Sequence, residues 1–142
     1  MSAPIEPDRP SSGPLSLSIS NLIVGLLRDY TGRGPTRART TIRDNVVLVM
    51  LEHTLTKGEQ SLVARGRSDK VLEIRHEFQE AMREESSTKI ASLTGRSVVA
   101  FLSANHIAPD VAAEIFLLDG PPRNGGPSSA EGAAQSASSA LR

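Results

Sequence analysis

The sequence predicts an α+β domain with the element order α-β-β-α-α-β-β, in which helices pack on one face of a four-stranded, mainly antiparallel sheet. Two observations lead to this prediction. Segments with apolar residues every three or four positions indicate helices, and two pairs of strand-like segments joined by short turns indicate hairpins. The length of 142 residues fits a single domain.

We expect the folded domain to span residues 15–119, between two disordered tails. Residues 1–14 and 120–142 are rich in Pro, Gly, Ser and Ala and contain few large apolar side chains. Such segments bury too little apolar surface to offset the entropy of ordering. No apolar run reaches about 18 residues, so the sequence predicts no transmembrane span.

The first helix is predicted by apolar residues at the spacing of one helix face. These residues are Ile19, Leu22, Ile23, Leu26, Leu27 and Tyr30. The segment 32–35 contains two glycines and a proline, which end a helix because glycine tolerates left-handed φ and proline cannot continue the hydrogen-bond pattern.

The first hairpin is predicted over residues 36–51. Residues 37–43 alternate in polarity, as in a half-buried strand, and the Asp-Asn pair at 44–45 favours a turn. The next six residues are all apolar, so both faces of this strand need cover. If the helices cover one face only, the uncovered set is either Val46, Leu48 and Met50 or Val47, Val49 and Leu51, and a second copy could cover it. If the N-terminal helix and the long acidic helix cover opposite faces, the chain stays a monomer.

Two helices and a second hairpin follow. Thr56 and Glu59 have capping-box spacing at the start of a short helix, and a longer helix is predicted from Ser68 to Thr94. Residues 96–104 and 111–118 are predicted strands, joined by a loop at 105–110. The apolar stripe of the longer helix is predicted to contain Val71, Ile74, Phe78, Ala81, Met82, Ile90 and Leu93.

Composition excludes several classes of protein. The 16 basic residues balance the 16 acidic residues, so overall charge does not favour nucleic-acid binding. The absence of cysteine excludes disulfides, thiolate metal sites and cysteine nucleophiles. No histidine pair has metal-binding spacing, and we predict neither a metal nor a cofactor. A cytoplasmic location, with a peripheral position at a membrane as an option, is the simplest fit.

An arginine stripe is the first candidate site. Its members are Arg33, Arg37, Arg39 and Arg43. Such a row could bind an anion, a nucleotide or an acidic partner, or it could keep an edge strand soluble. The acidic stretch at 73–85, with five Glu and two Arg, could also pair with it, within one chain or across a dimer.

A polar loop is the second candidate site. Asn105, His106 and Asp110 place amide, imidazole and carboxyl groups within six residues. This combination could serve a small enzyme, but the residues favour a turn built from Asn, Pro and Asp. No nucleophile motif or catalytic pair is present, so the sequence favours a non-enzymatic protein and assigns no catalytic residue.

Several sequence blocks resemble a known family in order and spacing. They lie at 20–24, 30–40, 55–56, 78–83, 93–103 and 105–110. Together they resemble a bacterial family of unknown function that is named after the C component (MpsC) of a sodium-translocating membrane-potential-generating system. The resemblance implies a soluble accessory or regulatory subunit and transfers no catalytic residue to this chain.

Three functions follow as hypotheses. The first is a non-enzymatic interaction module that forms a homodimer and serves as an accessory protein, with a membrane-system protein as a further partner. The second is a nucleotide, anion or nucleic-acid binder that uses the arginine stripe, although nucleic acid is not expected. The third is a small enzyme centred on the loop at 105–110.

Overall fold

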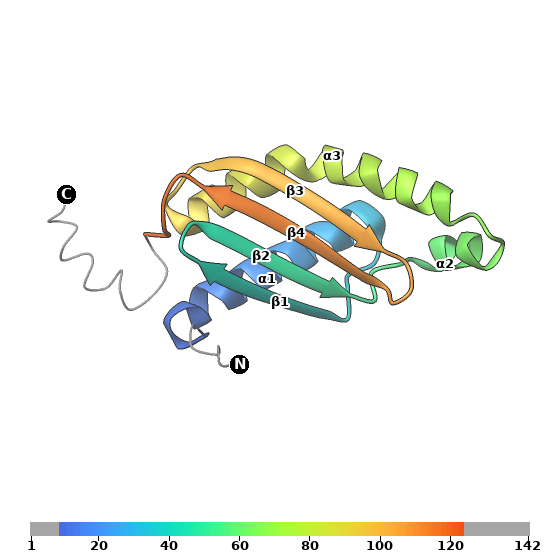
Figure 1. Cartoon of the computed structure of the whole chain (residues 1–142), viewed down its shortest axis with the longest axis horizontal. Coiled ribbons are helices and arrows are strands. Elements are labelled where there is room, and N and C mark those ends of the chain that lie inside the picture. Colours follow the sequence, from blue (N-terminus) through green and yellow to red (C-terminus); the bar gives the residue numbers. More distant parts are fainter. Residues whose placement is uncertain (1–8, 124–142) are drawn as a thin grey trace, which may run out of the picture.

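The computed structural model describes residues 9–123, which form three helices and four strands (Figure 1). The element order is the predicted α-β-β-α-α-β-β. The elements are α1 (Arg9–Thr31), β1 (Arg37–Arg43), β2 (Val46–Glu52), α2 (Lys57–Ala64), α3 (Ser68–Thr94), β3 (Val98–His106) and β4 (Val111–Leu118).

The four strands form one antiparallel sheet in the order β1-β2-β4-β3. Each hairpin contributes two adjacent strands, and the hairpins meet where β2 pairs with β4. The α2–α3 connection carries the chain from the end of β2 to β3, at the far edge of the sheet. The predicted α+β fold is therefore confirmed.

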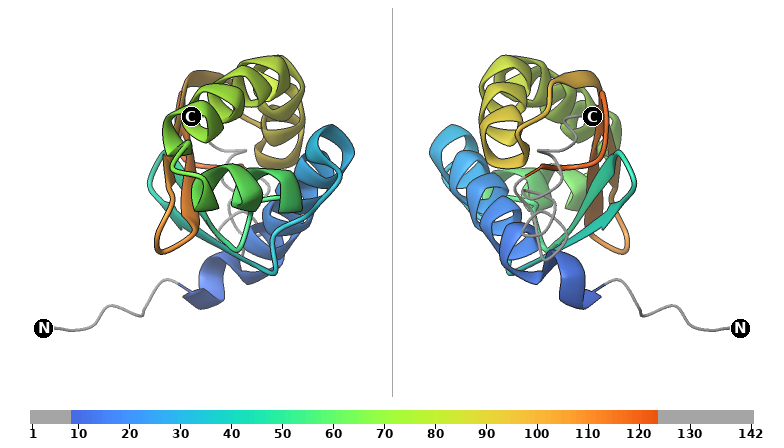
Figure 2. Two further views of the ribbon diagram at one scale, coloured as in Figure 1. Left: turned by 90° about the vertical axis from the view of Figure 1, so that its right-hand side faces the viewer. Right: turned by 90° about the vertical axis from the view of Figure 1, so that its left-hand side faces the viewer.

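Both long helices lie on the same side of the sheet (Figure 2). Helix α1 contacts β1, helix α3 contacts β3, and the two helices contact each other. We call the helix-covered side of the sheet the inner face and the opposite side the outer face. Because side chains alternate along a strand, each strand contributes every second residue to each face.

The hydrophobic core lies between the inner face and the two long helices. In β2 the inward residues are Val47, Val49 and Leu51, all fully buried, so the remaining set of Val46, Leu48 and Met50 faces outward. Phe116 of β4 is fully buried beside Phe101 of β3, with ring centroids 4.9 Å apart. From α1 the core receives Leu15, Ile19, Ile23, Leu26 and Leu27.

Helix α1 is longer than the sequence predicts. It begins at Arg9, so residues 9–14 are helical rather than part of a disordered tail. Gly13 and Pro14 are exposed in this added segment, which explains why apolar periodicity did not reveal it. The predicted end is confirmed, because Gly32 adopts φ 83° and its N–H donates to the Arg28 carbonyl.

Helix α2 begins with the predicted capping box, in which Thr56 Oγ1 accepts from Glu59 N and Glu59 Oε1 accepts from Thr56 N. Helix α3 has the predicted length, but its buried stripe differs. Ile74 and Ala81 were expected inside and are exposed. Val71, Met82 and Ile90 are buried as predicted, and the same helix face also buries Arg75, Gln79, Ser86 and Thr94.

The second hairpin is shifted relative to the sequence prediction. Strand β3 covers 98–106 rather than 96–104, so two residues of the expected loop belong to the strand. The start of the expected C-terminal tail is also placed, because Arg123 N donates to the carbonyl of Thr94. Residues 1–8 and 124–142, for which disorder was predicted, lie outside the described residues.

Candidate functional site

The outer face of the sheet is not covered by any other element within residues 9–123. Its central strands present apolar, partly exposed side chains, and β3 continues the surface with Leu102, which is 55% exposed. In Figure 2 no helix of the described chain lies on this side. The apolar outward residues are Val46, Leu48, Met50, Ala100, Leu102, Ala104, Val111, Ala113, Ile115 and Leu117.

Three of the four stripe arginines lie on this same face. Arg37, Arg39 and Arg43 point outward from edge strand β1, and the guanidinium of Arg39 lies 3.9 Å from the carboxylate of Glu52. Arg33 is separate, since it precedes β1 and donates from Nη2 to the His53 carbonyl at 3.1 Å. The structure therefore places a row of three arginines along one border of the apolar surface.

The three residues of the predicted polar loop, Asn105, His106 and Asp110, do not form one site. Asp110 accepts from the N–H and hydroxyl of Thr54 and from the N–H of Leu55, at 3.0–3.1 Å. His106 Nδ1 lies 2.9 Å from the Pro109 carbonyl within its own turn. Asn105 and His106 are neighbours in β3 and point to opposite faces of the sheet. Asp110 thus ties the β3–β4 turn to the segment after β2.

A buried ion pair lies beside this turn. Arg75 of α3 donates to both carboxylate oxygens of Glu59 at 2.9 and 3.2 Å and to the Thr54 carbonyl at 2.6 Å. Both charged side chains are 7% exposed. A buried charge is tolerated when it is paired and hydrogen-bonded, and this pair fixes α2 against α3.

Glu114 is a second buried acid, on the inner face of β4. It is 2% exposed and accepts a hydrogen bond from Ser103 Oγ. Loss of hydration on burial raises the pKa of Glu114 from 4.5 to about 7, against the opposing effects of Ser103, Arg75 and Gln79. The carboxyl therefore titrates near neutral pH.

Sequence reasoning missed this inner polar cluster. Glu59 was assigned only to the capping box, and the predicted apolar stripe of α3 did not include Arg75 or Gln79. One signal was present: Glu114 interrupts an otherwise apolar strand at a position that alternation places with Ala112 and Phe116. A single acid on the apolar side of a strand indicates a buried polar contact.

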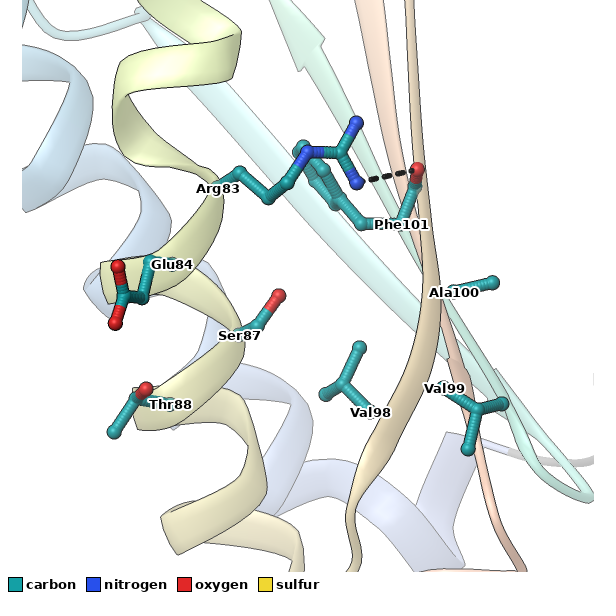
Figure 3. A pocket seen from close by; sticks show the side chains of 8 residues that line it. All are labelled: Arg83, Glu84, Ser87, Thr88, Val98, Val99, Ala100 and Phe101. Atoms are coloured by element: carbon teal, nitrogen blue, oxygen red, sulfur yellow. Dashed lines mark hydrogen bonds between the residues drawn. The ribbon is translucent and has the colours of Figure 1, made fainter.

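A groove runs between α3 and β3 (Figure 3). It has a volume of about 350 Å³, and it is lined by residues 83, 84, 87 and 88 of α3 and residues 98–101 of β3. Arg83 crosses from α3 toward the strand, where its guanidinium lies 5.1 Å from the centre of the Phe101 ring. Arg83 Nη1 also donates to the Phe101 carbonyl at a long 3.5 Å.

The described residues contain no helix that is long and apolar enough to cross a membrane. No curated protein and no solved structure matches the chain. One family matches over residues 11–120, and its description is "Na+-translocating membrane potential-generating system (MpsC)". This match spans the four strands, α2, α3 and all of α1 from residue 11 onward. The chain therefore belongs to the MpsC family.

Proposed function

We propose that this protein is a non-enzymatic accessory module that assembles through the outer face of its sheet, first with a second copy of itself. The observation that carries the proposal is the apolar outer face without a covering helix. An antiparallel sheet in water normally alternates apolar and polar side chains, with the polar ones outside. Here the outward residues of β2 and β4 are apolar except for Glu52.

The dimensions of the sheet set the strength of such a dimer. Four strands of seven or more residues present a surface of about 20 by 24 Å, from a strand spacing near 4.8 Å and a rise near 3.4 Å per residue. Two copies would bury about 900 Å² in total, below the range of roughly 1,200–2,000 Å² for stable complexes. We therefore expect a weak, reversible dimer.

The arginine row selects between the two ways of stacking the sheets. A two-fold axis perpendicular to the strands would place β1 over the β1 of the partner subunit, so that arginine would face arginine. An axis parallel to the strands would place β1 over the uncharged β3 of the partner subunit. The second arrangement avoids repulsion between like charges, and we propose it for this protein.

Sedimentation equilibrium of the full chain, from low micromolar to sub-millimolar concentration, tests the proposal. We expect the average mass to rise from one chain toward two. Leu102→Glu, on the outer face, should weaken the dimer at least tenfold. Leu17→Glu is the matched control, because Leu17 is similarly exposed, at 62% against 55%, but lies on α1. A single-chain mass throughout, or equal effects of the two variants, would overturn the proposal.

The family description links this module to a membrane-potential-generating system, and we propose that its further partner is a protein of such a system. The cytoplasmic location remains a prediction. Binding of an anion or nucleotide to the arginine row also remains a prediction, which the exposure of Arg37 and Arg39 favours. Isothermal titration calorimetry with inorganic phosphate, on the unmodified protein and on the double variant Arg37→Glu/Arg39→Glu, would test this prediction by comparing their affinities for phosphate.

A further inference from the structure

Strand β3 forms one edge of the sheet, and its hydrogen-bonding pattern shows which of its main-chain groups are free. His53 N donates to the Asp110 carbonyl and Leu118 N donates to the Asn45 carbonyl, so odd-numbered residues of β2 bond to β4. Since bonding sides alternate along a strand, the odd-numbered residues of β4 bond to even-numbered residues of β3. The residues of β3 that face the free edge are Phe101, Ser103 and Asn105.

The two edges of the sheet differ in protection against pairing with another strand. Edge strand β1 carries three arginines, a common device against such pairing. Strand β3 is the longest strand, with nine residues, and contains no Lys, Arg, Asp, Glu or Pro. Its one irregularity is a register shift between Val98 and Ala100, at its start. The middle and end of β3 thus present an unprotected edge.

The space beside this edge is partly open. The groove of about 350 Å³ lies between β3 and α3, and in Figure 3 Val98 and Phe101 point from the strand into this space. Within the described part of the chain, one side chain donates a hydrogen bond to a main-chain group at this edge. It is the long contact from Arg83 to the Phe101 carbonyl. At the other end of the strand, Asn105 Oδ1 is buried without a hydrogen-bond partner. A strand edge beside a helix is an arrangement by which proteins bind extended peptides.

The charge on α3 indicates the chemistry of the incoming segment. Glu73, Glu77, Glu80 and Glu84 are exposed along one side of the helix. Three basic residues of the helix are paired, because Arg75 is buried against Glu59, Lys70 lies 3.4 Å from Glu73 and Arg83 pairs with Glu80 at 3.0 Å. Helix α3 contains six acidic and four basic residues, and Glu84 lines the groove, so the net charge of the helix favours a basic side chain beside it.

We propose that the free edge of β3 binds an extended segment of a partner protein, in which apolar and basic side chains alternate, as a fifth antiparallel strand. Its apolar side chains would extend the outer face next to Leu102. Its basic side chains would point to the inner side, toward the glutamates of α3. The main-chain bonds at 101, 103 and 105 would supply affinity independently of sequence.

A second copy fits this edge poorly. Pairing of β3 with β3 of the partner subunit would bring two acidic α3 helices side by side. Strand β1 of a second copy is basic, but its arginines lie on the outer face and would continue there, away from α3. The proposal is independent of the sheet-face dimer, which leaves the β3 edge open.

The probe is a capped, fluorescein-labelled peptide in which four valines alternate with three lysines, and the matched control peptide has glutamate in place of lysine. Fluorescence anisotropy with the full chain should give at least tenfold tighter binding of the lysine peptide. Hydrogen exchange of the unmodified protein should slow at the amides of Phe101, Ser103 and Asn105 when the lysine peptide is added. Similar affinities for the two peptides, or protection elsewhere, would overturn the proposal.

Two proline variants separate edge pairing from non-specific attraction. Asn105→Pro removes an N–H that faces the free edge without breaking the β3–β4 ladder, and edge strands tolerate such prolines. It should weaken peptide binding at least tenfold. Ala38→Pro makes the same change at the free edge of β1 and should leave binding unchanged. Equal affinity of the two variants for the lysine peptide would refute pairing at the β3 edge. Slower exchange of the β3 edge amides at higher protein concentration without peptide would show that a second copy, and not a partner segment, pairs there.

Discussion

Replacing Glu114 with glutamine should change the dependence of folding stability on pH. Glutamine has nearly the same shape as the protonated acid, and its oxygen can accept the hydrogen bond that Ser103 donates. The substitution removes only the ability to ionise. It therefore isolates the free-energy cost of a buried carboxylate in the space between the sheet and α3.

The magnitude follows from the pKa. A rise from 4.5 in an exposed carboxyl to about 7 in the folded protein corresponds to about 3 kcal/mol between the two protonation states. Because folding raises the pKa, the group stabilises the folded state fully below pH 4.5, and this stability is lost as pH rises to 7. Above pH 7 the loss is constant.

Urea unfolding followed by circular dichroism between about pH 4 and pH 8 measures this effect. We expect Glu114→Gln and the unmodified protein to have similar unfolding free energies at about pH 4, and the variant to be up to about 3 kcal/mol more stable at about pH 8. Glu77→Gln is the control, since it removes an exposed carboxyl from the neighbouring helix. A difference between Glu114→Gln and the unmodified protein that stays constant over this pH range would refute the reasoning.

Three further substitutions test other parts of the structure. Arg75→Met leaves the buried carboxylate of Glu59 without its cation, so we expect a loss of about 3–5 kcal/mol in urea unfolding; a loss near zero would contradict a buried ion pair. Thr56→Ala removes the cap of α2 and should cost about 1 kcal/mol, seen as a lower melting temperature. Gly95 ends α3 at φ 71°, so Gly95→Ala should cost about 1 kcal/mol by the same measurement, and an unchanged melting temperature would argue against this conformation.

Local chemistry made much of this fold predictable. The turn at 44–45, the capping box at Thr56 and the helix end at 32–35 depend on neighbouring residues, and all three are found. The period of α1 likewise identified its buried face. The start of α1 escaped prediction because residues 9–14 have no apolar periodicity.

Apolar periodicity could not predict the inner polar cluster. Arg75 and Gln79 are buried because Glu59 and Glu114, from other elements, lie against α3 and satisfy them. Helix periodicity by itself predicts that a charged residue is exposed, because it takes no account of residues from other elements. Its burial depends on partners that are 16 or more positions away in the sequence, as with Glu59 and Arg75.

The sequence by itself determined that the strand at 46–51 is apolar on both sides, and that one of its two residue sets would lack cover if the helices packed on one face. Only the tertiary structure decided that Val46, Leu48 and Met50 form the uncovered set. It also decided that β1 and β3 are the two edges of the sheet. Alternation along a strand separates two faces but does not identify them, because the side that is buried depends on where α1 and α3 pack.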